Sequence, residues 1–470
     1  AAVKDYCKEK KLRLHMPGHI GGRGMLVPEL STLASLDLTE VAGLDDLHLP
    51  RNVIQEAALL MAEAYAARES FFLVNGATSG IHALFMSMQP PSGKVLLPRN
   101  AHRSFFGGMV LAGTSPVYIP GQIDHVLGVA LTVLSEDIED LLGENPDAEA
   151  VFITSPSYYG SSCDIEGIEP AVHAANALLL VDEAHGGHFP FHRAYPRPAL
   201  QCGADAVVNG LHKTLPVLNQ GACLHLGKDF PNRDKVFAAY SLLTTTSPSY
   251  PILASLDLAR ELMCQRGEAL LDRAWHLAGE YRKKIQQLKG LDCHGEAEMQ
   301  QIPGLKEIDP LKLLIIPRGL SIDGFELAQI LRDSYKIEVE HADNKFILAM
   351  MSMFHERADW ESLYRSLEDI AGKYAGKQPD GLRLELPPWP QLSLLPREAF
   401  MAASRTVRLK DSQGLIAAEM VAPYPPGIPC LLPGELISPE IFSYLEFLQK
   451  SRVHLQGPHD PSLNYLKVIE

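Results

Sequence analysis

A lysine and an aspartate, each at the end of a short apolar run, are the residues of this chain best placed to do chemistry. Lys213 follows a run that contains Val207 and Val208, and Asp182 follows the apolar residues 178–181. Both runs have the length and the unbroken hydrophobicity of buried parallel strands. Because parallel strands present their carboxyl ends at the same edge of a sheet, we expect the amine and the carboxylate to share one cleft.

An amine and a carboxylate in this arrangement suit pyridoxal 5'-phosphate (PLP). The aldehyde of PLP bonds covalently to a lysine amine, and its pyridine nitrogen stays protonated beside a carboxylate. Each residue taken separately has an ordinary explanation, since a lysine after a strand is commonly a solvated loop residue and an aspartate there is often a helix N-cap. The prediction of two catalytic residues therefore depends on the pairing of Lys213 with Asp182.

Residues 71–80 predict a site for the cofactor phosphate. The run 71–74 is strand-like, Asn75 and Gly76 form a turn, and a helix then begins. The free N–H groups of a helix N-terminus bind phosphate, and here two hydroxyls lie beside them. An ordinary capped helix would show the same pattern, but with Lys213 and Asp182 downstream we favour phosphate binding by Ala77, Thr78 and Ser79.

Two histidines suggest further contacts with the cofactor. His102 follows the strand-like run 94–97 and could stack its ring on the flat cofactor, although a loop histidine is commonly solvated. His212 adjoins Lys213 and could place an acid near the reacting carbon, or it could simply pack at the end of the strand.

The run 182–188 contains His185 and His188, which imitate a two-histidine metal site. The intervening glycines argue against a helix that would hold both on one face, and no third ligand is evident, so we predict no metal site. We expect instead that the small Ala184 packs under the cofactor ring. His185 is expected near the phenolic oxygen or the lysine–cofactor bond, and Glu183 is expected to be structural.

Composition argues against several classes of protein. With 470 residues, 46% hydrophobic and 21% charged, the chain has an ample core and room for two or three domains. A formal net charge of −15 argues against a nucleic-acid surface, which needs a basic face. No apolar stretch reaches the roughly 18 residues of a membrane-spanning helix, and residues 1–5 lack a signal-peptide pattern. The seven cysteines show no metal-ligand spacing and favour a reducing compartment, so we expect a cytoplasmic protein.

Strand-like runs recur between residues 71 and 226 with helical stretches between them, which is typical of a mainly parallel, doubly wound α/β sheet. A long helix is expected over 255–289, followed by strands near 312–316 and 346–350. We therefore predict an N-terminal arm at 1–60, a large cofactor-binding domain at 61–290, a small α/β domain at 291–375, a linker at 376–390 and a C-terminal domain at 391–470.

With these motifs assembled, the chain resembles the Orn/Lys/Arg decarboxylases, PLP enzymes of fold type I with the aspartate-aminotransferase-like fold, and specifically their short bacterial form. The matching segments cover nearly the whole chain and occur in the family's order: 14–19, 37–40, 43–48, 75–80, 182–188, 212–216, 246–250 and 423–429. The resemblance implies a mainly parallel, seven-stranded-type sheet in the large domain, flanked by helices, with smaller α/β domains after it. It also implies that Lys213 carries the cofactor, Asp182 pairs with the pyridine nitrogen, His102 stacks on the ring, and the start of the helix at Ala77 holds the phosphate.

The same resemblance implies a homodimer or a higher homo-oligomer with shared active sites. The loop formed by Thr245, Thr246 and Ser247 would then reach toward the neighbour's phosphate. The chain departs from the family's usual residues at four positions: Gly210 stands for Ser, Ile20 for Lys, Asn52 for Gly and Asn219 for Thr. The glycine puts one hydroxyl contact with the phosphate in doubt.

The resemblance implies decarboxylation of a basic amino acid for polyamine biosynthesis, with arginine giving agmatine as the first expectation. Lysine giving cadaverine and ornithine giving putrescine remain alternatives. A basic substrate needs an acidic pocket, for which the candidates are Asp45, Asp46, Glu419 and Glu435, although each could equally be a surface carboxylate or a cap. The rival interpretations are an aminotransferase, which would hold the substrate carboxylate on an arginine, and a non-catalytic regulatory relative.

Overall fold

The computed structural model describes residues 1–88, 93–299, 301–377, 387–424, 428–451 and 453–470. Most of the predicted linker at 376–390, and residues 425–427 of the proline-rich motif, lie outside the described residues. The chain divides into two compact units. The first comprises Ala1–Met88, Thr154–Pro156 and Leu178–Leu271, and the second comprises Gln89–Ile153, Ser157–Ala177 and Asp272–Glu470. This division is by compactness rather than chain order, so the domain boundaries predicted from sequence stay predictions.

The first unit contains four neighbouring strands of the central sheet. In order they are β1 (Glu69–Leu73), β10 (Ala222–Leu226), β9 (Ala206–Asn209) and β8 (Leu178–Asp182). β8 and β9 pair in parallel, with Asp182 opposite Val208, whereas β10 runs antiparallel to both β9 and β1. Every residue of β9 and β10 is buried, as the apolar composition of a central strand requires. The parallel pair predicted at 178–182 and 206–208 is confirmed.

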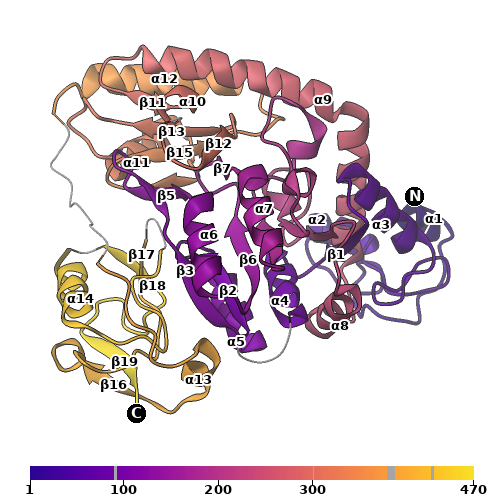
Figure 1. Cartoon of the computed structure of the whole chain (residues 1–470). Coiled ribbons are helices and arrows are strands. Elements are labelled where there is room, and N and C mark those ends of the chain that lie inside the picture. Colours follow the sequence, from indigo (N-terminus) through magenta and orange to yellow (C-terminus); the bar gives the residue numbers. More distant parts are fainter. Residues whose placement is uncertain (89–92, 300, 378–386, 425–427, 452) are drawn as a thin grey trace. The chain divides into compact units, whose positions relative to one another are not determined.

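The described residues of the first unit also contain six α-helices or parts of them, which are labelled in Figure 1. They are α1 (Ala2–Lys8), α2 (Pro28–Ser35), α3 (Val53–Ala64), α4 (Ala77–Ser87), α8 (Arg233–Leu243) and the start of α9 (Tyr250–Gln286), with 3-10 turns η1 (Phe189–Phe191), η2 (Ala199–Cys202) and η3 (Leu211–Lys213). Tyr6, Leu38 and Leu44 of the N-terminal arm pack with Tyr250 in a small separate core. The first turns of the arm are therefore anchored to the start of α9.

The second unit contains the other three strands of the central sheet, in the order β6 (Ala148–Thr154), β2 (Lys94–Pro98) and β3 (Ser115–Ile119). β2 runs parallel to both of its neighbours. The associated helices are α5 (Arg103–Ala112), α6 (Ser135–Glu144) and α7 (Ile165–Ala174). Two separate antiparallel pairs join β4 (Gln122–Asp124) to β5 (Val129–Thr132) and β7 (Ser161–Cys163) to β12 (Leu305–Ile308). A mainly parallel central sheet of seven strands with flanking helices confirms the predicted α/β class.

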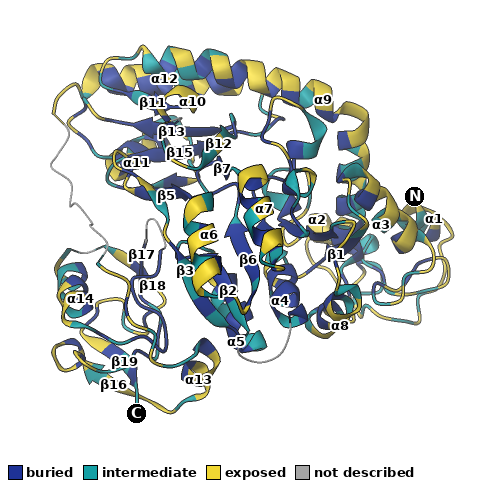
Figure 2. Cartoon of the chain, viewed as in Figure 1, coloured by how far each residue is buried: buried dark blue, intermediate teal, exposed yellow. Residues whose placement is uncertain are grey.

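A four-stranded antiparallel sheet follows in the second unit, in the order β11 (Asp292–His294), β13 (Lys312–Ile316), β15 (Ile347–Met350) and β14 (His341–Ala342). Its helices are α10 (Glu296–Met299), α11 (Gly324–Tyr335) and α12 (Arg357–Lys373). Buried Trp360, Leu363, Leu367 and Ile370 recur at helical spacing on α12, which leaves the opposite face exposed (Figure 2).

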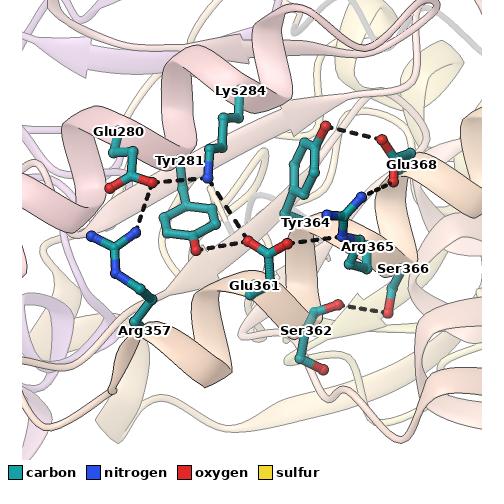
Figure 3. A network of polar contacts seen from close by, with 10 residues as sticks. All are labelled: Glu280, Tyr281, Lys284, Arg357, Glu361, Ser362, Tyr364, Arg365, Ser366 and Glu368. Atoms are coloured by element: carbon teal, nitrogen blue, oxygen red, sulfur yellow. Dashed lines mark hydrogen bonds and ion pairs between the residues drawn. The ribbon is translucent and has the colours of Figure 1, made fainter.

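The end of α9 is joined to α12 by an aromatic stack and by a network of polar contacts; Figure 3 shows the polar contacts. The rings of Tyr281 and Trp360 stack with centroids 5.8 Å apart. Around them, Glu280 binds Arg357 and Lys284 at 2.8 Å each. The hydrogen bond from Arg357 is the main cause of a pKa for Glu280 of about 2. The three charged side chains are partly or largely exposed, so their ion pairs contribute little to the free energy of unfolding.

The C-terminal part of the second unit has a core of its own, which includes Val421, Leu431, Ile441, Leu445 and Leu466. Its elements are α13 (Pro396–Met401), β16 (Ser404–Arg408), the 3-10 turn η4 (Leu409–Asp411), β17 (Ala422–Tyr424), α14 (Pro439–Ser451), β18 (His454–Gln456) and β19 (Tyr465–Ile469). β16 pairs with β19 and β17 with β18, both antiparallel. Among the described residues, no helix of the chain is long and apolar enough to cross a membrane.

The close packing of α4 on the first unit's strands gives a stability prediction. A Cβ added at Gly80 would lie 2.6 Å from Leu73 Cδ1 and 3.2 Å from Val208 Cγ1, and both side chains are buried. We expect Gly80→Ala to lower the free energy of unfolding by about 1–3 kcal/mol through overpacking.

The matched control is Gly279→Ala on the exposed face of α9, where a Cβ meets nothing within 4 Å. That change should raise stability by up to about 1 kcal/mol because alanine favours helix. Thermal unfolding of both variants checks the pair, and an unchanged midpoint for Gly80→Ala would contradict it.

Candidate active site

Asp182 and Lys213 lie at the carboxyl ends of adjacent parallel strands in the first unit. Asp182 is the last residue of β8, and Lys213 ends the turn η3 that follows β9. The carboxylate of Asp182 is buried and accepts a hydrogen bond from the Ala184 N–H at 3.1 Å. Burial raises the pKa of Asp182, although the charge of Lys213 and the Ala184 N–H act in the opposite direction. A desolvated carboxylate of this kind is stabilised by a cationic partner such as a protonated ring nitrogen.

The Lys213 amine contacts a buried histidine. Its Nζ lies 3.0 Å from Nε2 of His185, and the His185 ring is only 8% exposed. A charged amine donates to an unprotonated Nε2, so this contact gives the lysine proton a defined acceptor. His185 thus lies at the reactive amine, in the neighbourhood that the sequence predicted, while its role toward a cofactor stays a prediction.

His212 is fixed by a main-chain contact. Its Nδ1 lies 3.0 Å from the carbonyl oxygen of Gly221 and donates a hydrogen bond to it. Burial lowers the pKa of His212, the hydrogen bond to Gly221 acts against this, and the charge of Lys213 lowers the pKa further. The lowered pKa favours the neutral ring, and the acid role expected of His212 from sequence stays a prediction.

The start of α4 has the features of an anion site. α4 begins at Ala77, and its N-cap Gly76 has a φ of 80° and provides no side-chain cap. Only glycine adopts this backbone readily, and the N–H groups of the first turn then face outward without a capping side chain. Ser79 turns back to Gly76, with its N–H and Oγ donating to the Gly76 oxygen at 3.1 and 2.8 Å. Ala77 and Thr78 are therefore the residues of the predicted set whose N–H groups are best placed for a phosphate.

Gly210 marks a close approach between the ends of β8 and β9. A Cβ at Gly210 would lie 3.0 Å from the Ala184 oxygen, and 3.3 Å from both Ala184 Cβ and Lys213 Cδ. The serine usual in similar proteins would require Ala184 or Lys213 to shift by a few tenths of an ångström. The glycine thus allows the two strand ends to approach closely.

The loop of Thr245, Thr246 and Ser247 is exposed, and Thr245 is tied to two parts of the first unit. Its N–H lies 3.4 Å from Asn75 Oδ1, and its carbonyl accepts a hydrogen bond from His48 Nε2 at 2.9 Å. Asn75 precedes Gly76, so the loop lies beside the start of α4 of its own chain. Sequence reasoning missed His48 and Asn75 as residues that link this loop to the arm and to α4, although both stand within motifs that it had identified.

His102 belongs to the second unit, where it is exposed and serves as the N-cap of α5. Its Nδ1 lies 3.3 Å from the Ser104 nitrogen and 2.8 Å from Ser104 Oγ. The cap fixes the Nδ1 edge of the ring. Stacking of His102 on a cofactor ring stays a prediction.

Three of the four carboxylates considered for substrate binding already have other partners. Asp45 accepts hydrogen bonds from the N–H groups of residues 46, 51, 52, 54 and 55, and so caps α3. Glu419 accepts from the N–H groups of His459 and Lys467 at 2.6 Å each. Glu435 forms a buried ion pair with Arg99. These contacts disfavour all three as free partners for a basic substrate, whereas Asp46 is exposed and accepts only from the His48 N–H among the contacts described.

Glu183 has contacts of the structural kind that were expected for it. Its carboxylate accepts from the Ala199 N–H at 2.8 Å and from Asn209 Nδ2 at 3.0 Å. Burial raises its pKa to about 8 against these hydrogen bonds. Asn209, the last residue of β9, therefore fixes the residue next to Asp182. Among the described residues, no group of three His, Cys, Asp or Glu side chains could hold a metal ion.

Comparisons with known proteins match the whole chain. The family described as "Orn/Lys/Arg decarboxylase, major domain" matches residues 1–359, and "Orn/Lys/Arg decarboxylase, C-terminal domain" matches residues 387–460. The "Arginine decarboxylase" of Bacillus subtilis (strain 168) is 35% identical over 475 residues, which is 100% of this chain and 96% of that protein. The "Constitutive lysine decarboxylase" of Escherichia coli (strain K12) is 23% identical over 95% of this chain and 76% of its own length.

A search of solved structures supports the fold. The lysine decarboxylase LdcF of Francisella novicida superimposes with a TM-score of 0.86 at 21% identity, covering 100% of this chain and 80% of that one. The lysine decarboxylase A of Pseudomonas aeruginosa gives a TM-score of 0.84 at 20% identity, with the same coverage. At these identities the likeness shows a shared fold type I architecture.

The capping role of Asp45 gives a prediction with a pH dependence. Although burial alone would raise it, the N–H donors hold the pKa of Asp45 below the ordinary value, so the carboxylate stabilises the folded state above pH ~4. We expect Asp45→Ala to lower the free energy of unfolding by about 2 kcal/mol at pH 7. The difference from wild type should shrink as the pH falls below about 4, through the folded-state pKa. Asp46→Ala, the matched control, should change stability by less than about 0.5 kcal/mol. Urea unfolding across this pH range measures both, and an Asp45→Ala protein of normal stability would contradict the assignment.

Proposed function

Because the chain belongs to the Orn/Lys/Arg decarboxylase family, we propose that it binds PLP through Lys213 and decarboxylates L-arginine to agmatine. The observation that carries this proposal is the pair formed by the Lys213 amine and the buried Asp182 carboxylate at adjacent parallel strand ends. The choice of arginine rests on relatives named arginine decarboxylase, which are 34 or 35% identical to this chain, whereas those named lysine decarboxylase are 23% identical.

The residues present fit PLP. Burial raises the pKa of Asp182, so its charged form would be stabilised by a nearby cation. The protonated pyridine nitrogen of PLP is such a cation. The uncapped start of α4 suits a phosphate, and Lys213 supplies the amine. When bound, PLP accepts the electron pair left on the substrate as its bond to the carboxylate carbon breaks.

The other steps are assigned to side chains of the protein. Asp182 would hold the ring nitrogen protonated, and its burial would strengthen that interaction because the local dielectric is low. Lys213 returns a proton to the substrate α-carbon after carbon dioxide has left. His185 accepts the hydrogen bond of the lysine amine, and His212 can relay a proton in the same region.

Recognition of the substrate side chain is the least defined part of the proposal. Of the four carboxylates considered, Asp46 is the one that is exposed and has a single described partner. We propose it as the first candidate for contact with the basic side chain. Lysine and ornithine remain the alternative substrates, since Asp46 would attract any of the three cations.

A product assay tests the function. Purified protein supplied with PLP should release carbon dioxide and form agmatine from arginine faster than cadaverine from lysine or putrescine from ornithine. The Lys213→Ala protein should stay folded and lose the visible absorbance band of lysine-bound cofactor, because it lacks the bonding amine. Asp182→Asn should keep bound cofactor and lose several orders of magnitude in turnover, since an amide does not keep the ring nitrogen protonated.

Other outcomes of this assay would replace the proposal. Faster formation of cadaverine would identify a lysine decarboxylase. Transfer of the amino group to a keto acid without carbon dioxide would identify an aminotransferase. A protein that binds PLP and turns over none of the three amino acids would be a regulatory relative.

We further propose a cytoplasmic homodimer or higher homo-oligomer whose interface includes the N-terminal arm. The arm exposes large apolar side chains that a second copy could cover, including Leu26 at 99%, Leu14 at 87% and Leu12 at 72% exposure. Singly exposed leucines are ordinary, but a concentration of them in one segment favours an interface. None of the seven cysteines, all within the described residues, forms a disulfide, which agrees with a reducing compartment.

Dilution tests the oligomer. We expect light scattering to show at least a dimer, and activity to fall as dilution produces monomers, because the resemblance implies active sites that are shared between subunits. Leu26→Glu should weaken the assembly, whereas Phe400→Glu, which alters an exposed apolar residue outside the arm, should leave it intact. A monomer with full specific activity would refute the shared site.

A further inference from the structure

Arg99, the first residue after β2, has its side chain buried and joined to the C-terminal part of the second unit. Its Nη2 donates to Glu435 Oε2 at 2.8 Å, and its Nη1 donates to Glu435 Oε1. Its Nε donates to the carbonyl oxygen of Pro429 at 3.1 Å. The side chains of Arg99 and Glu435 are 2% and 0% exposed. The guanidinium thus binds a carboxylate in the two-pronged geometry that only arginine offers.

The surroundings of this ion pair leave it little freedom. The guanidinium carbon lies 4.8 Å from the ring centroid of Tyr118 and 5.1 Å from that of Trp389. Glu435 Oε2 also accepts a hydrogen bond from the Leu432 N–H at 2.7 Å. Burial raises the pKa of Glu435, and the hydrogen bond and charge of Arg99 act in the opposite direction. The pair is therefore held from both ends in one geometry.

Arg99 also begins the short loop that leads to His102. Residues 99–102 connect β2 to α5, and His102 is the N-cap of that helix. Within the loop, Asn100 Nδ2 donates to the Ala130 oxygen at 3.2 Å. Because only two residues lie between Arg99 and His102, a displacement of Arg99 by the C-terminal residues would also displace the histidine.

A stabilising role alone does not explain a buried ion pair at this position. Replacing such a pair with apolar residues of similar volume is often neutral or stabilising, because both charges must be desolvated. What the charged pair adds is a defined geometry, since the bidentate contact tolerates small displacements less well than apolar packing does. A fixed geometry of this kind is useful where the position of the attached loop, here residues 99–102, affects function.

We propose that Arg99 and Glu435 are positioning residues that set the place of His102 and couple it to the C-terminal part of the chain. This inference rests on the proposed function and on the predicted stacking of His102 on the cofactor ring. Arg99 and Glu435 act through the loop and not by contact with cofactor or substrate. The C-terminal segment that follows the proline-rich motif would thereby influence the active site from a distance.

The test compares single and double variants of the full-length, PLP-loaded protein. Arg99→Met and Glu435→Leu each leave a buried charge unpaired, so each should lower the thermal midpoint by about 5–15 °C. The double variant removes both charges and should recover most of that loss. It should nevertheless keep kcat reduced about ten- to a hundredfold with a nearly unchanged KM, because the histidine is misplaced. The visible circular dichroism of its bound cofactor should change in the same direction as in His102→Ala.

Matched controls separate positioning from general stability. Arg233 and Glu69 form another two-pronged ion pair, at 2.7 and 2.8 Å, in the first unit. Their double replacement by Met and Leu should leave kcat and the circular dichroism of the cofactor at wild-type values. Arg99→Lys keeps the charge and loses the two-pronged contact, so it should fold and show a smaller change of the same kind.

The outcomes are distinct. A stable Arg99→Met/Glu435→Leu protein with wild-type kcat and circular dichroism would overturn the inference and leave a structural ion pair. If the double variant does not fold, Arg99→Lys decides, and wild-type values for it would overturn the inference. A wild-type protein that neither binds PLP nor decarboxylates would instead overturn the proposed function.

Discussion

The parallel pairing of β8 with β9 is the constraint on which the rest of the candidate site depends. It brings a buried carboxylate and a lysine amine to one edge of the sheet, and its continuation in the hydrogen bond from the Glu183 N–H to the Val208 oxygen keeps the strand ends in register beyond Asp182. The missing Cβ at Gly210 permits the close approach, and the Asn209 side chain fixes Glu183. Burial then gives Asp182 its raised pKa. The chemistry follows from a backbone arrangement that desolvates one charge and places another nearby.

Carboxylates show how the same residue type serves different purposes in this fold. Asp182 is buried with few partners and is therefore reactive toward a cation. Asp45 is also buried, but main-chain N–H groups stabilise its charge, so its pKa is lowered and it caps a helix. Glu435 is neutralised by an arginine. The number and kind of donors around each carboxylate, rather than its burial, decides which of these roles it has.

Sequence reasoning succeeded where local pattern decides structure. The strands at 178–182 and 206–209 are mainly apolar runs, and Asp182 and Lys213 stand at or just after their ends. The position of Asp182 at the end of β8 and of Lys213 shortly after β9 could therefore be predicted. β3 and β10 were not predicted, because Pro116 and His225 interrupt their apolar runs. The partners of Glu435 and Glu419 could not be predicted. Glu435 binds Arg99, which is 336 positions away, and Glu419 accepts hydrogen bonds from residues 40 and 48 positions away. Only the tertiary structure determines such contacts, and the same is true of the hydrogen bond from His212 to Gly221.

The contacts of Thr245 with Asn75 and His48 have a consequence for how the protein would respond to its ligand. One hydrogen bond ties the loop to the residue before the N-cap of α4, and the other ties it to the N-terminal arm. An anion bound at the start of α4 and an ordered arm therefore draw on the same local structure, and each favours the other by thermodynamic linkage. Proteolytic nicking of the arm would weaken anion binding, and saturating ligand would protect the arm from the protease. For the proposed cofactor, loading and the proteolytic resistance of residues 1–60 would then be two measures of one equilibrium.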